Sequence, residues 1–137
     1  MNEQLRLAGC IITDNNNGVL LIHRNTPKRT QWEIPGGKID QGESAKQAVV
    51  REIQEEVGVH VKIVRQLGAK EFNEDVYTMH YSWYLGNIEE GTPHIGEPDK
   101  YDDLRYFDLT SLENVRSELS GNTVNFLDAW SRGEFTV

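Results

Sequence analysis

The stretch that decides the fold is residues 37–59, GKIDQGESAKQAVVREIQEEVGV. Its residues 44–57 have a helical composition, and Gly58 is the residue type that commonly follows the last turn of a helix. At about 100° per residue, the apolar side chains of this stretch fall on one arc. They are Val49, Val50, Ile53 and Val57. The pattern predicts an amphipathic helix over residues 44–57 whose apolar arc faces the core.

The same helix carries Glu52, Glu55 and Glu56 at positions i, i+3 and i+4, which places them in one contiguous patch. Like charges at these spacings cost about 0.2–0.5 kcal/mol per pair, and the patch borders the apolar arc. Arg51 can reach Glu55, but one guanidinium cannot neutralise three carboxylates. A hard dication such as Mg²⁺ can, because it takes oxygen ligands and keeps phosphates in its shell. A solvated acidic helix face is the alternative interpretation.

The residues just before the helix favour the metal interpretation. Gly36 and Gly37 let the backbone turn sharply and approach a ligand closely. Glu43 stands before the first helical turn, where the positive end of the helix dipole favours a carboxylate. Glycines, a helix start and a carboxylate cluster therefore converge within one short stretch, as a site for a metal ion and a phosphate requires.

Working outward, apolar and β-branched runs predict strands at residues 5–13, 19–23, 32–34, 59–71, 76–85 and 104–109. Residues 14–18, DNNNG, predict a tight hairpin between the first two strands, and residues 73–75 predict another turn. Residues 89–103 form a long acidic loop. A helical turn begins at Thr110, and residues 122–131 form the last helix. This order predicts a layered α/β (α+β) fold rather than a doubly wound nucleotide-binding fold.

Length and composition limit the class of protein. The chain has 137 residues, which predicts a single domain over residues 1–137. Its single cysteine, Cys10, excludes an internal disulfide framework and a Cys-rich zinc site, and it fits a reducing, cytoplasmic location. No run reaches about 18 apolar residues, and no basic start precedes an apolar stretch, so we expect neither a membrane span nor a secretory signal.

The charge of the chain limits its partners. The formal net charge is −8, which argues against a protein that coats the backbone of a nucleic-acid polymer. It does not argue against small phosphorylated substrates, because a bound divalent cation reverses the local field.

The spacing of Gly37, Glu43 and the run 51–59, REIQEEVGV, resembles the Nudix box with every defined position filled. The preceding run 32–37, WEIPGG, is similar to the family's usual lead-in. The resemblance implies a Nudix α/β/α sandwich with a mixed central sheet. It also implies a hydrolase that cuts the diphosphate linkage between a nucleoside diphosphate and another group, using Mg²⁺, with Mn²⁺ as the alternative ion.

The resemblance also implies roles for individual residues. The implied metal ligands are the carboxylates of Glu52, Glu55 and Glu56 and the carbonyl of Gly36. Arg51 is similar to the residue that orients the glutamates, while Gly37, Glu43 and Gly58 take structural positions. A divalent cation in such a site lowers the pKa of a bound water, and a carboxylate takes the proton of that water. Glu52 is the first candidate for this base, and a carboxylate of the late loop is the second.

The late loop contains the run 96–100, GEPDK, which is similar to a segment of MutT-type members where an acidic residue outside the box joins the metal site. Glu97 is the chosen residue, with Asp99, Asp102 and Asp103 as rivals and a solvated loop as the alternative. Candidates for contacts with the substrate phosphates are Arg24, Lys28, Arg29, Gly37, Lys38 and Lys100. Exposed loop cations with no ligand are the alternative for the basic residues.

The substrate is expected to be a small nucleotide. The short chain and the Glu97 segment favour a nucleoside triphosphate, ribo or deoxyribo, cut to the monophosphate and pyrophosphate. Sugar nucleotides, dinucleoside polyphosphates and a domain that binds without turnover are the alternatives. Side chains that could contact a base are Trp32, Tyr77, Tyr81, Trp83, Asn122 and Asn125, with core packing or helix capping as the competing roles. A homodimer is a further expectation from the fold.

Overall fold

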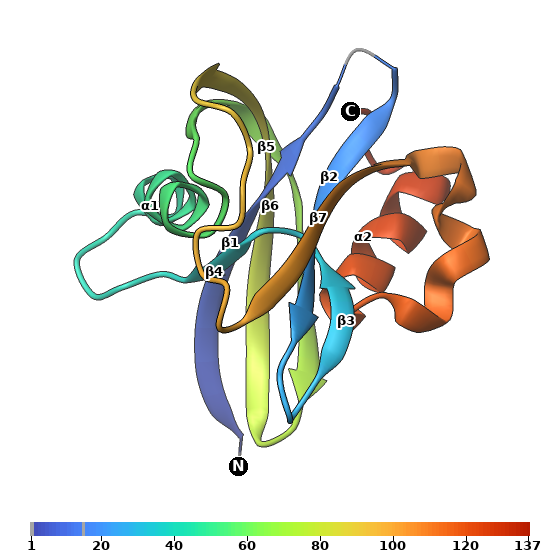
Figure 1. Cartoon of the computed structure of the whole chain (residues 1–137). Helices are drawn as coiled ribbons and strands as arrows, with labels where there is room; N and C mark the ends of the chain where they lie inside the picture. Colours follow the sequence, from blue (N-terminus) through green and yellow to red (C-terminus); the bar gives the residue numbers. More distant parts are fainter. Residues whose placement is uncertain (1, 15) are drawn as a thin grey trace.

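The computed structural model describes residues 2–14 and 16–137, which form two β-sheets flanked by helices (Figure 1). A mixed sheet has the strand order β4 (Gly36–Lys38), β1 (Glu3–Ile12), β6 (Tyr77–Glu90) and β5 (His60–Glu74). Its β1 and β6 run parallel, and its other pairs are antiparallel. A second, antiparallel sheet has the order β3 (Thr30–Glu33), β2 (Gly18–Asn25) and β7 (Tyr101–Asp108).

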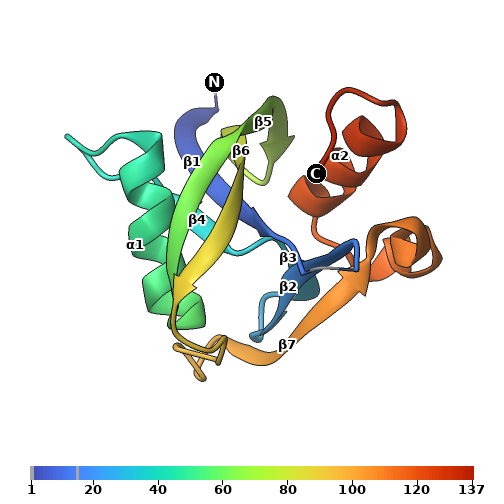
Figure 2. The same ribbon diagram turned by 90° about the horizontal axis from the view of Figure 1, so that it is seen from above.

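The helices cover opposite sides of the mixed sheet (Figure 2). Helix α1 (Ala45–Val57) packs on one face, whereas α2 (Gly121–Ser131) and the 3₁₀ segment η1 (Leu109–Glu118) lie on the other side with the second sheet. The predicted α/β class with helices on a mixed sheet is confirmed, and the structure adds the division of the strands into two sheets. In the part of the chain that the structure describes, no helix is long and apolar enough to cross a membrane.

The predicted hairpin between the first two strands is wrong. Strands β1 and β2 belong to different sheets, and an isolated bridge between Thr13 and Val19 is the pairing recorded between them. The reason is that β1 is buried on both faces: Leu7 and Ile11 enter one core cluster, while Ala8 and Cys10 enter the other. A strand buried on both faces is typical of parallel pairing inside a sandwich. Of the predicted turn, Asn15 lies outside the described residues.

The helix that carries the glutamates forms where the sequence predicts it. Ser44 caps its N-terminus by accepting from the Gln47 amide, and the Gln47 side chain accepts from the Ser44 amide, a reciprocal capping box. Gly58 ends the helix at φ 72°, a left-handed conformation that glycine adopts without steric cost. Val49, Ile53 and Val57 are fully buried against the mixed sheet. The hydrophobic arc therefore fixes which face of α1 the glutamates occupy.

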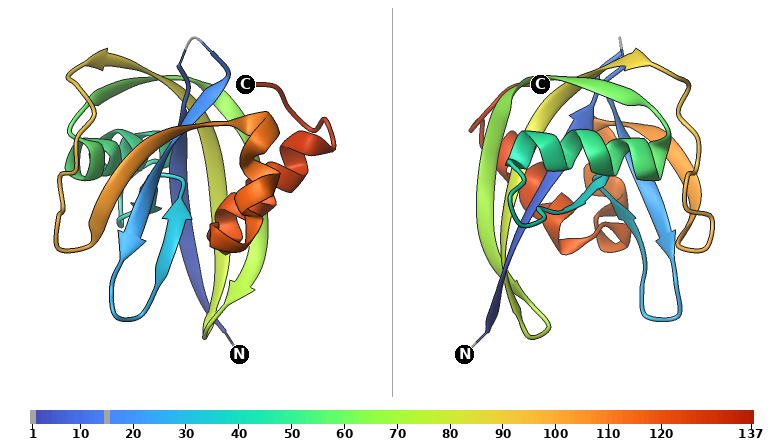
Figure 3. Two further views of the ribbon diagram at one scale, coloured as in Figure 1. Left: turned by 45° about the vertical axis from the view of Figure 1, so that its right-hand side comes forward. Right: turned by 90° about the vertical axis from the view of Figure 1, so that its left-hand side faces the viewer.

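Two other differences from the sequence prediction, and the placement of two turns, matter for the site. Residues 36–38 form β4, a strand that the sequence does not predict, which pairs with β1 and brings Gly36 and Gly37 beneath α1. The last helix begins at Gly121 with Ser120 as its N-cap, so the capping role considered for Asn122 is wrong. The β2–β3 loop and the tip of the β5–β6 hairpin project at the same end of the molecule (Figure 3).

Candidate active site

A cavity of about 490 Å³ is lined by α1, β4, the β2–β3 segment, the β5–β6 hairpin and the loop before β7. Its carboxylates are Glu33, Glu52, Glu55, Glu56, Glu74 and Glu97. Its basic residues are Arg24, Lys28, Arg29, Lys38 and Lys100. The cavity therefore brings together every metal-ligand and phosphate-contact residue that the sequence singles out, Gly36 and Gly37 included. Charges of both signs side by side suit a divalent cation next to phosphate oxygens.

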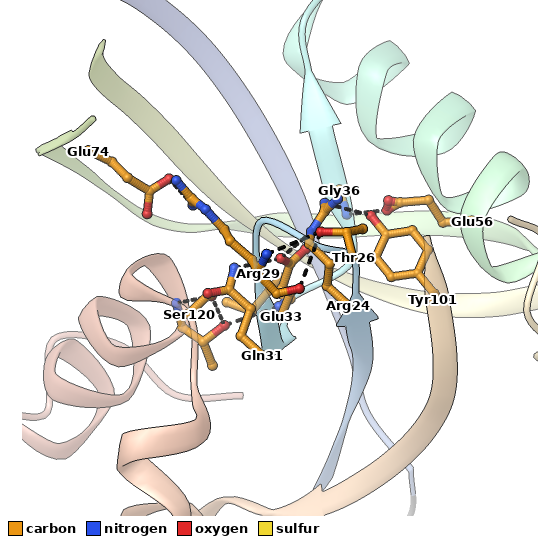
Figure 4. Close-up of polar contacts among 12 residues, drawn as sticks. Arg24, Thr26, Arg29, Gln31, Glu33, Gly36, Glu56, Glu74, Tyr101 and Ser120 are labelled. Atoms are coloured by element: carbon orange, nitrogen blue, oxygen red, sulfur yellow. Dashed lines mark hydrogen bonds and ion pairs between the residues drawn. The ribbon is translucent and has the colours of Figure 1, made fainter. Parts of the chain in front are cut away.

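Glu56 is the most enclosed of these carboxylates, with 2% of its surface exposed. Its Oε1 accepts a hydrogen bond of 3.0 Å from the Gly36 amide, so β4 holds it from below (Figure 4). Burial raises the pKa of the Glu56 carboxyl well above its ordinary value, because the charged form loses its hydration. A buried carboxylate with one backbone donor is held rigidly and carries charge that the protein does not fully compensate.

Glu52 and Glu55 stand on the same helix under looser restraint. The Glu52 carboxylate packs on Gly37 so closely that a Cβ added to Gly37 would lie 2.6 Å from the carboxyl carbon. Burial raises the pKa of Glu52. Glu55 is half exposed, 3.5 Å from Arg51. The three carboxylates therefore range from buried to half exposed along one helical turn.

Arg51 joins the helix to the segment before it. Its Nε and Nη2 donate to the two oxygens of Glu43 at 2.8 and 2.9 Å, and its Nη1 donates to Glu52 Oε1 at 2.9 Å. Nη2 also donates to the Lys38 carbonyl at 3.0 Å. A planar guanidinium can serve all of these acceptors at once, whereas an ammonium cannot. Arg51 thus contacts both Glu52 and Glu43 where the segment after β4 meets α1, and the roles implied for Arg51 and Glu43 stay predictions.

We expect the Glu43–Arg51 pair to make stability acid-sensitive. Hydrogen bonds from Arg51 and the Asp40 amide lower the pKa of Glu43 from 4.5 to about 2. A depressed pKa contributes stability that is present above pH 4.5 and is lost as the pH falls toward 2. Replacing Glu43 by Gln should lower the melting temperature at pH 7 and flatten its decline between these pH values. Thermal unfolding followed by circular dichroism measures both, and equal slopes in the two proteins would contradict the assignment.

In the late loop the structure separates Glu97 from its three rivals. Glu97 lines the cavity, and its charge contributes to the raised pKa values of Glu52 and Glu56. Lys100 lies 3.4 Å from the Glu97 carboxylate. Asp102 pairs with His23 and Asn25, Asp103 pairs with Arg105, and Asp99 is exposed outside the cavity lining.

Arg24 is held by two residues that the sequence does not single out. Its Nε donates to Glu33 Oε2 at 2.7 Å, and its Nη2 donates to Glu33 Oε1 at 3.1 Å and to the Tyr101 hydroxyl at 3.0 Å (Figure 4). The Glu33 hydrogen bond is the main cause of the raised pKa of Arg24. The antiparallel register of β2 and β3 brings these side chains together. The alternation of side chains along a strand was the sequence signal available for Glu33. That alternation does not identify Arg24 as the partner of Glu33.

Arg29 and Lys28 face the β5–β6 hairpin. The Arg29 guanidinium pairs with Glu74 at 2.7 Å and with Asp75, and Lys28 lies 3.5 Å from Asp75. The hydrogen bond to Glu74 is the main cause of the raised pKa of Arg29. These two cations therefore line the cavity, but Glu74 and Asp75 already balance their charges. They differ in this from a pair of cations that is free to bind phosphate.

The cavity is also lined by apolar side chains. They are Leu7, Ile34, Phe72, Met79 and Tyr81, with Asn122 and Ser120 at the start of α2. Of the aromatic residues considered for base contact, Tyr81 lines the cavity. Trp32 packs on Phe107, Trp83 packs on Phe126, and Tyr77 is outside the lining. Asn122 Oδ1 accepts from Trp83 Nε1 at 2.9 Å, which fixes this amide at the cavity wall, while Asn125 lies outside the lining.

The donor set fits a hard dication. In residues 2–14 and 16–137 no three metal-ligating side chains are already gathered closely enough to hold an ion, because Glu52 binds Arg51 and Glu56 binds Gly36. Mutual repulsion of like charges favours such separate partners. Mg²⁺ prefers oxygen ligands. The site offers such oxygens beside Gly36 and Gly37, and Glu56 is buried against the Gly36 amide.

Comparisons with known proteins agree with this geometry. The model of the NUDIX domain family matches residues 4–128. An 8-oxo-dGTP diphosphatase of Escherichia coli (strain K12) is 44% identical over 59 residues, which are 42% of this chain and 46% of that protein. An NAD-capped RNA hydrolase of Vibrio atlanticus (strain LGP32) is 31% identical over 114 residues, 80% of this chain and 40% of that protein.

The crystal structure of a MutT NUDIX hydrolase from Burkholderia pseudomallei superposes with a TM-score of 0.79 at 27% identity, covering 92% of this chain and 97% of that one. The matched stretches span 54%, 46% and 27% of the first three curated relatives, about half of their length or less. The comparisons therefore agree on the family and on the fold.

Proposed function

The chain belongs to the NUDIX family, and from that membership we propose that it hydrolyses the diphosphate linkage of nucleoside diphosphate derivatives. The observation that carries the proposal is the set of glutamates on one turn of α1, packed against Gly36 and Gly37 inside a cavity that also holds basic side chains. Diphosphate cleavage needs both: oxygen ligands for a cation and positive charge for the phosphates.

Each residue then has a defined task. Glu52, Glu55, Glu56, Glu97 and the Gly36 carbonyl would hold Mg²⁺ or Mn²⁺, which when bound neutralises phosphate charge and lowers the pKa of a water. Glu56 contributes a fixed oxygen because it is buried and bonded to Gly36. Glu52 is the first candidate to accept the proton of the attacking water, since it lines the cavity and Arg51 orients it. A base in the late loop, Glu97, is the second.

The rest of the cavity would bind the nucleotide. Arg24 and Lys100 are the basic residues on the carboxylate side, where they can contact phosphates as Lys38 can from β4. The apolar lining residues, with Tyr81 and Asn122, would contact the base. We infer that a nucleoside triphosphate, cut to the monophosphate and pyrophosphate, is the preferred substrate. The E. coli relative named for 8-oxo-dGTP supports this, whereas the Vibrio relative is named for NAD-capped RNA.

The test is a ³¹P NMR measurement of products from nucleoside triphosphates, sugar nucleotides and dinucleoside polyphosphates with saturating Mg²⁺. We expect pyrophosphate and a monophosphate from triphosphates, and no turnover when EDTA removes the metal. The Glu55→Gln variant should lose at least about 100-fold in kcat, because removal of one electrostatic contact to the reacting groups costs about this much. Its melting temperature should stay near that of the parent, since Glu55 is half exposed.

Each outcome separates the candidates. Turnover of dinucleoside polyphosphates alone would replace the substrate but keep the chemistry. Tight nucleotide binding without product from any compound would indicate a binding domain. Parental rates in Glu55→Gln at saturating Mg²⁺ would contradict its assignment as a metal ligand.

A further inference from the structure

The long loop before β7 caps the C-terminus of α1. The last carbonyls of a helix have no partner inside the helix and need donors from elsewhere. Here the Gly96 amide donates to the Glu56 carbonyl and the His94 amide donates to the Val57 carbonyl, both at 2.9 Å. The Gly58 amide donates to the Gln54 carbonyl at 3.1 Å. A segment about forty residues along the chain thus completes the helix that carries the glutamates (Figure 3).

Close packing leaves this loop little freedom. A Cβ added to Gly96 would overlap the carbonyl oxygen of Glu55, which belongs to the backbone of α1 and cannot swing away. The His94 ring lies against Gly58, where a Cβ would overlap the imidazole. His94 Nδ1 also donates to the Thr92 carbonyl at 3.0 Å, which fixes the orientation of the ring. The loop is therefore locked to α1 at two glycines.

The residue that follows Gly96 is Glu97. The amides of Lys100 and Tyr101 both donate to its carbonyl, at 3.0 and 3.1 Å, and the Asn25 amide donates to the Lys100 carbonyl at 2.8 Å. The backbone around Glu97 is thus held by α1 on one side and by β2 on the other. Its carboxylate faces the cavity from a position that depends on the end of the same helix that carries Glu52 and Glu56.

The geometry points to Gly96 and His94 as positioning residues that hold the Glu97 carboxylate at the metal site by capping α1. This inference rests on the proposed function, since it assumes that Glu97 is a metal ligand there. Groups that orient a metal ligand typically contribute about 10–100-fold to metal affinity or activity. Gly96 and His94 would act through Glu97 and not through the bulk stability of the protein.

The test is a double-mutant cycle with Gly96→Ala and Glu97→Gln, read out by Mn²⁺ binding in electron paramagnetic resonance without substrate and by kcat. We expect each single variant to weaken Mn²⁺ binding and lower kcat by about 10–100-fold. The loss in the double variant should be much smaller than the product of the two single losses, because most of the Gly96→Ala effect acts through Glu97. His94→Ala, which keeps the backbone bonds, should show a smaller loss with the same non-additivity.

The control is Gly68→Ala, a glycine to alanine change in β5 whose Cβ would meet nothing closer than 3.5 Å. It should keep parental Mn²⁺ affinity and kcat. The inference would be overturned if the losses of Gly96→Ala and Glu97→Gln multiply in the double variant. It would also be overturned if His94→Ala causes the same loss in the Glu97→Gln background as in the parent. Parental behaviour of Glu97→Gln would overturn it too, but would leave the proposed function standing on the α1 glutamates.

Discussion

The Glu56→Gln variant should lose about 10³-fold in kcat at saturating Mg²⁺. A bound cation contributes several kcal/mol to stabilisation of the transition state, and about 1.4 kcal/mol corresponds to tenfold in rate. The amide keeps an oxygen that can still accept from the Gly36 amide, so the contact between α1 and β4 survives. Steady-state kinetics with a nucleoside triphosphate, together with circular dichroism to show that the fold is retained, measure the effect.

The same substitution should change stability in the opposite direction. The folded-state pKa of Glu56 is raised above 4.5, so its contribution to stability is fully present below that pH and is lost as the pH rises through the folded pKa. In EDTA at neutral pH, Glu56→Gln should therefore melt higher than the parent. Its stability should also decline less between pH 4.5 and neutrality, with the remaining decline due to Glu52.

Added Mg²⁺ provides the internal control for Glu56. A ligand that binds only the folded state raises the melting temperature in proportion to the logarithm of its concentration over Kd. The parent should show this increase and Glu56→Gln should show little of it. A variant that melts lower than the parent in EDTA, or that keeps parental kcat, would contradict the structural role assigned to Glu56.

Alanine substitutions at the adjacent glycines Gly36 and Gly37 should differ in their effects: the first should mainly lower stability and the second should mainly lower activity. A Cβ at Gly36 would overlap the backbone of β1 at the Ala8 carbonyl and Gly9, and backbone cannot move aside without loss of the β1–β4 pairing. We expect Gly36→Ala to cost about 3 kcal/mol in the free energy of unfolding, the upper part of the usual range for overpacking. A Cβ at Gly37 would instead meet the Glu52 carboxylate, the end of a flexible side chain.

Gly37→Ala should accordingly keep most of its stability and lose about 10–100-fold in kcat, because Glu52 is displaced from its position beside Arg51. Urea unfolding and steady-state kinetics on both variants measure the contrast. Gly42→Ala is the matched control, since its Cβ would meet nothing within 4 Å and its cost comes only from the positive φ of 81°. Equal stabilities of Gly36→Ala and Gly42→Ala would show that the β1–β4 contact is loose.

The predictions from the sequence agree best with the structure where local sequence patterns determine the element. The 3.6-residue periodicity and Gly58 place α1 to within one residue, and the structure makes Ser44 the N-cap instead of the first helical residue. The glutamates fall on one side of it because side-chain direction follows from helical geometry alone. The carboxylate cluster, the glycine corner and the helix boundaries could thus be predicted from the sequence. The single domain, the cytoplasmic location and the homodimer stay predictions.

Pairings between distant segments could not be predicted in this way. The chain separates β1 from β2 because β1 is buried on both faces and takes β4 and β6 as neighbours, a choice that depends on the whole core. The hydrogen bonds from Arg24 to Glu33, the ion pair of Arg29 with Glu74, and the capping of α1 by residues 94 and 96 have the same origin.

What the sequence by itself determined is the set of chemical groups and their spacing along one helix, since a helix converts spacing into direction without help from the rest of the chain. Only the tertiary structure decided which acidic partner each cation of the cavity takes, and which acidic residue of the late loop lines the cavity beside the carboxylates of α1. Those outcomes depend on strand register and loop packing, which are fixed by contacts between residues far apart in the chain.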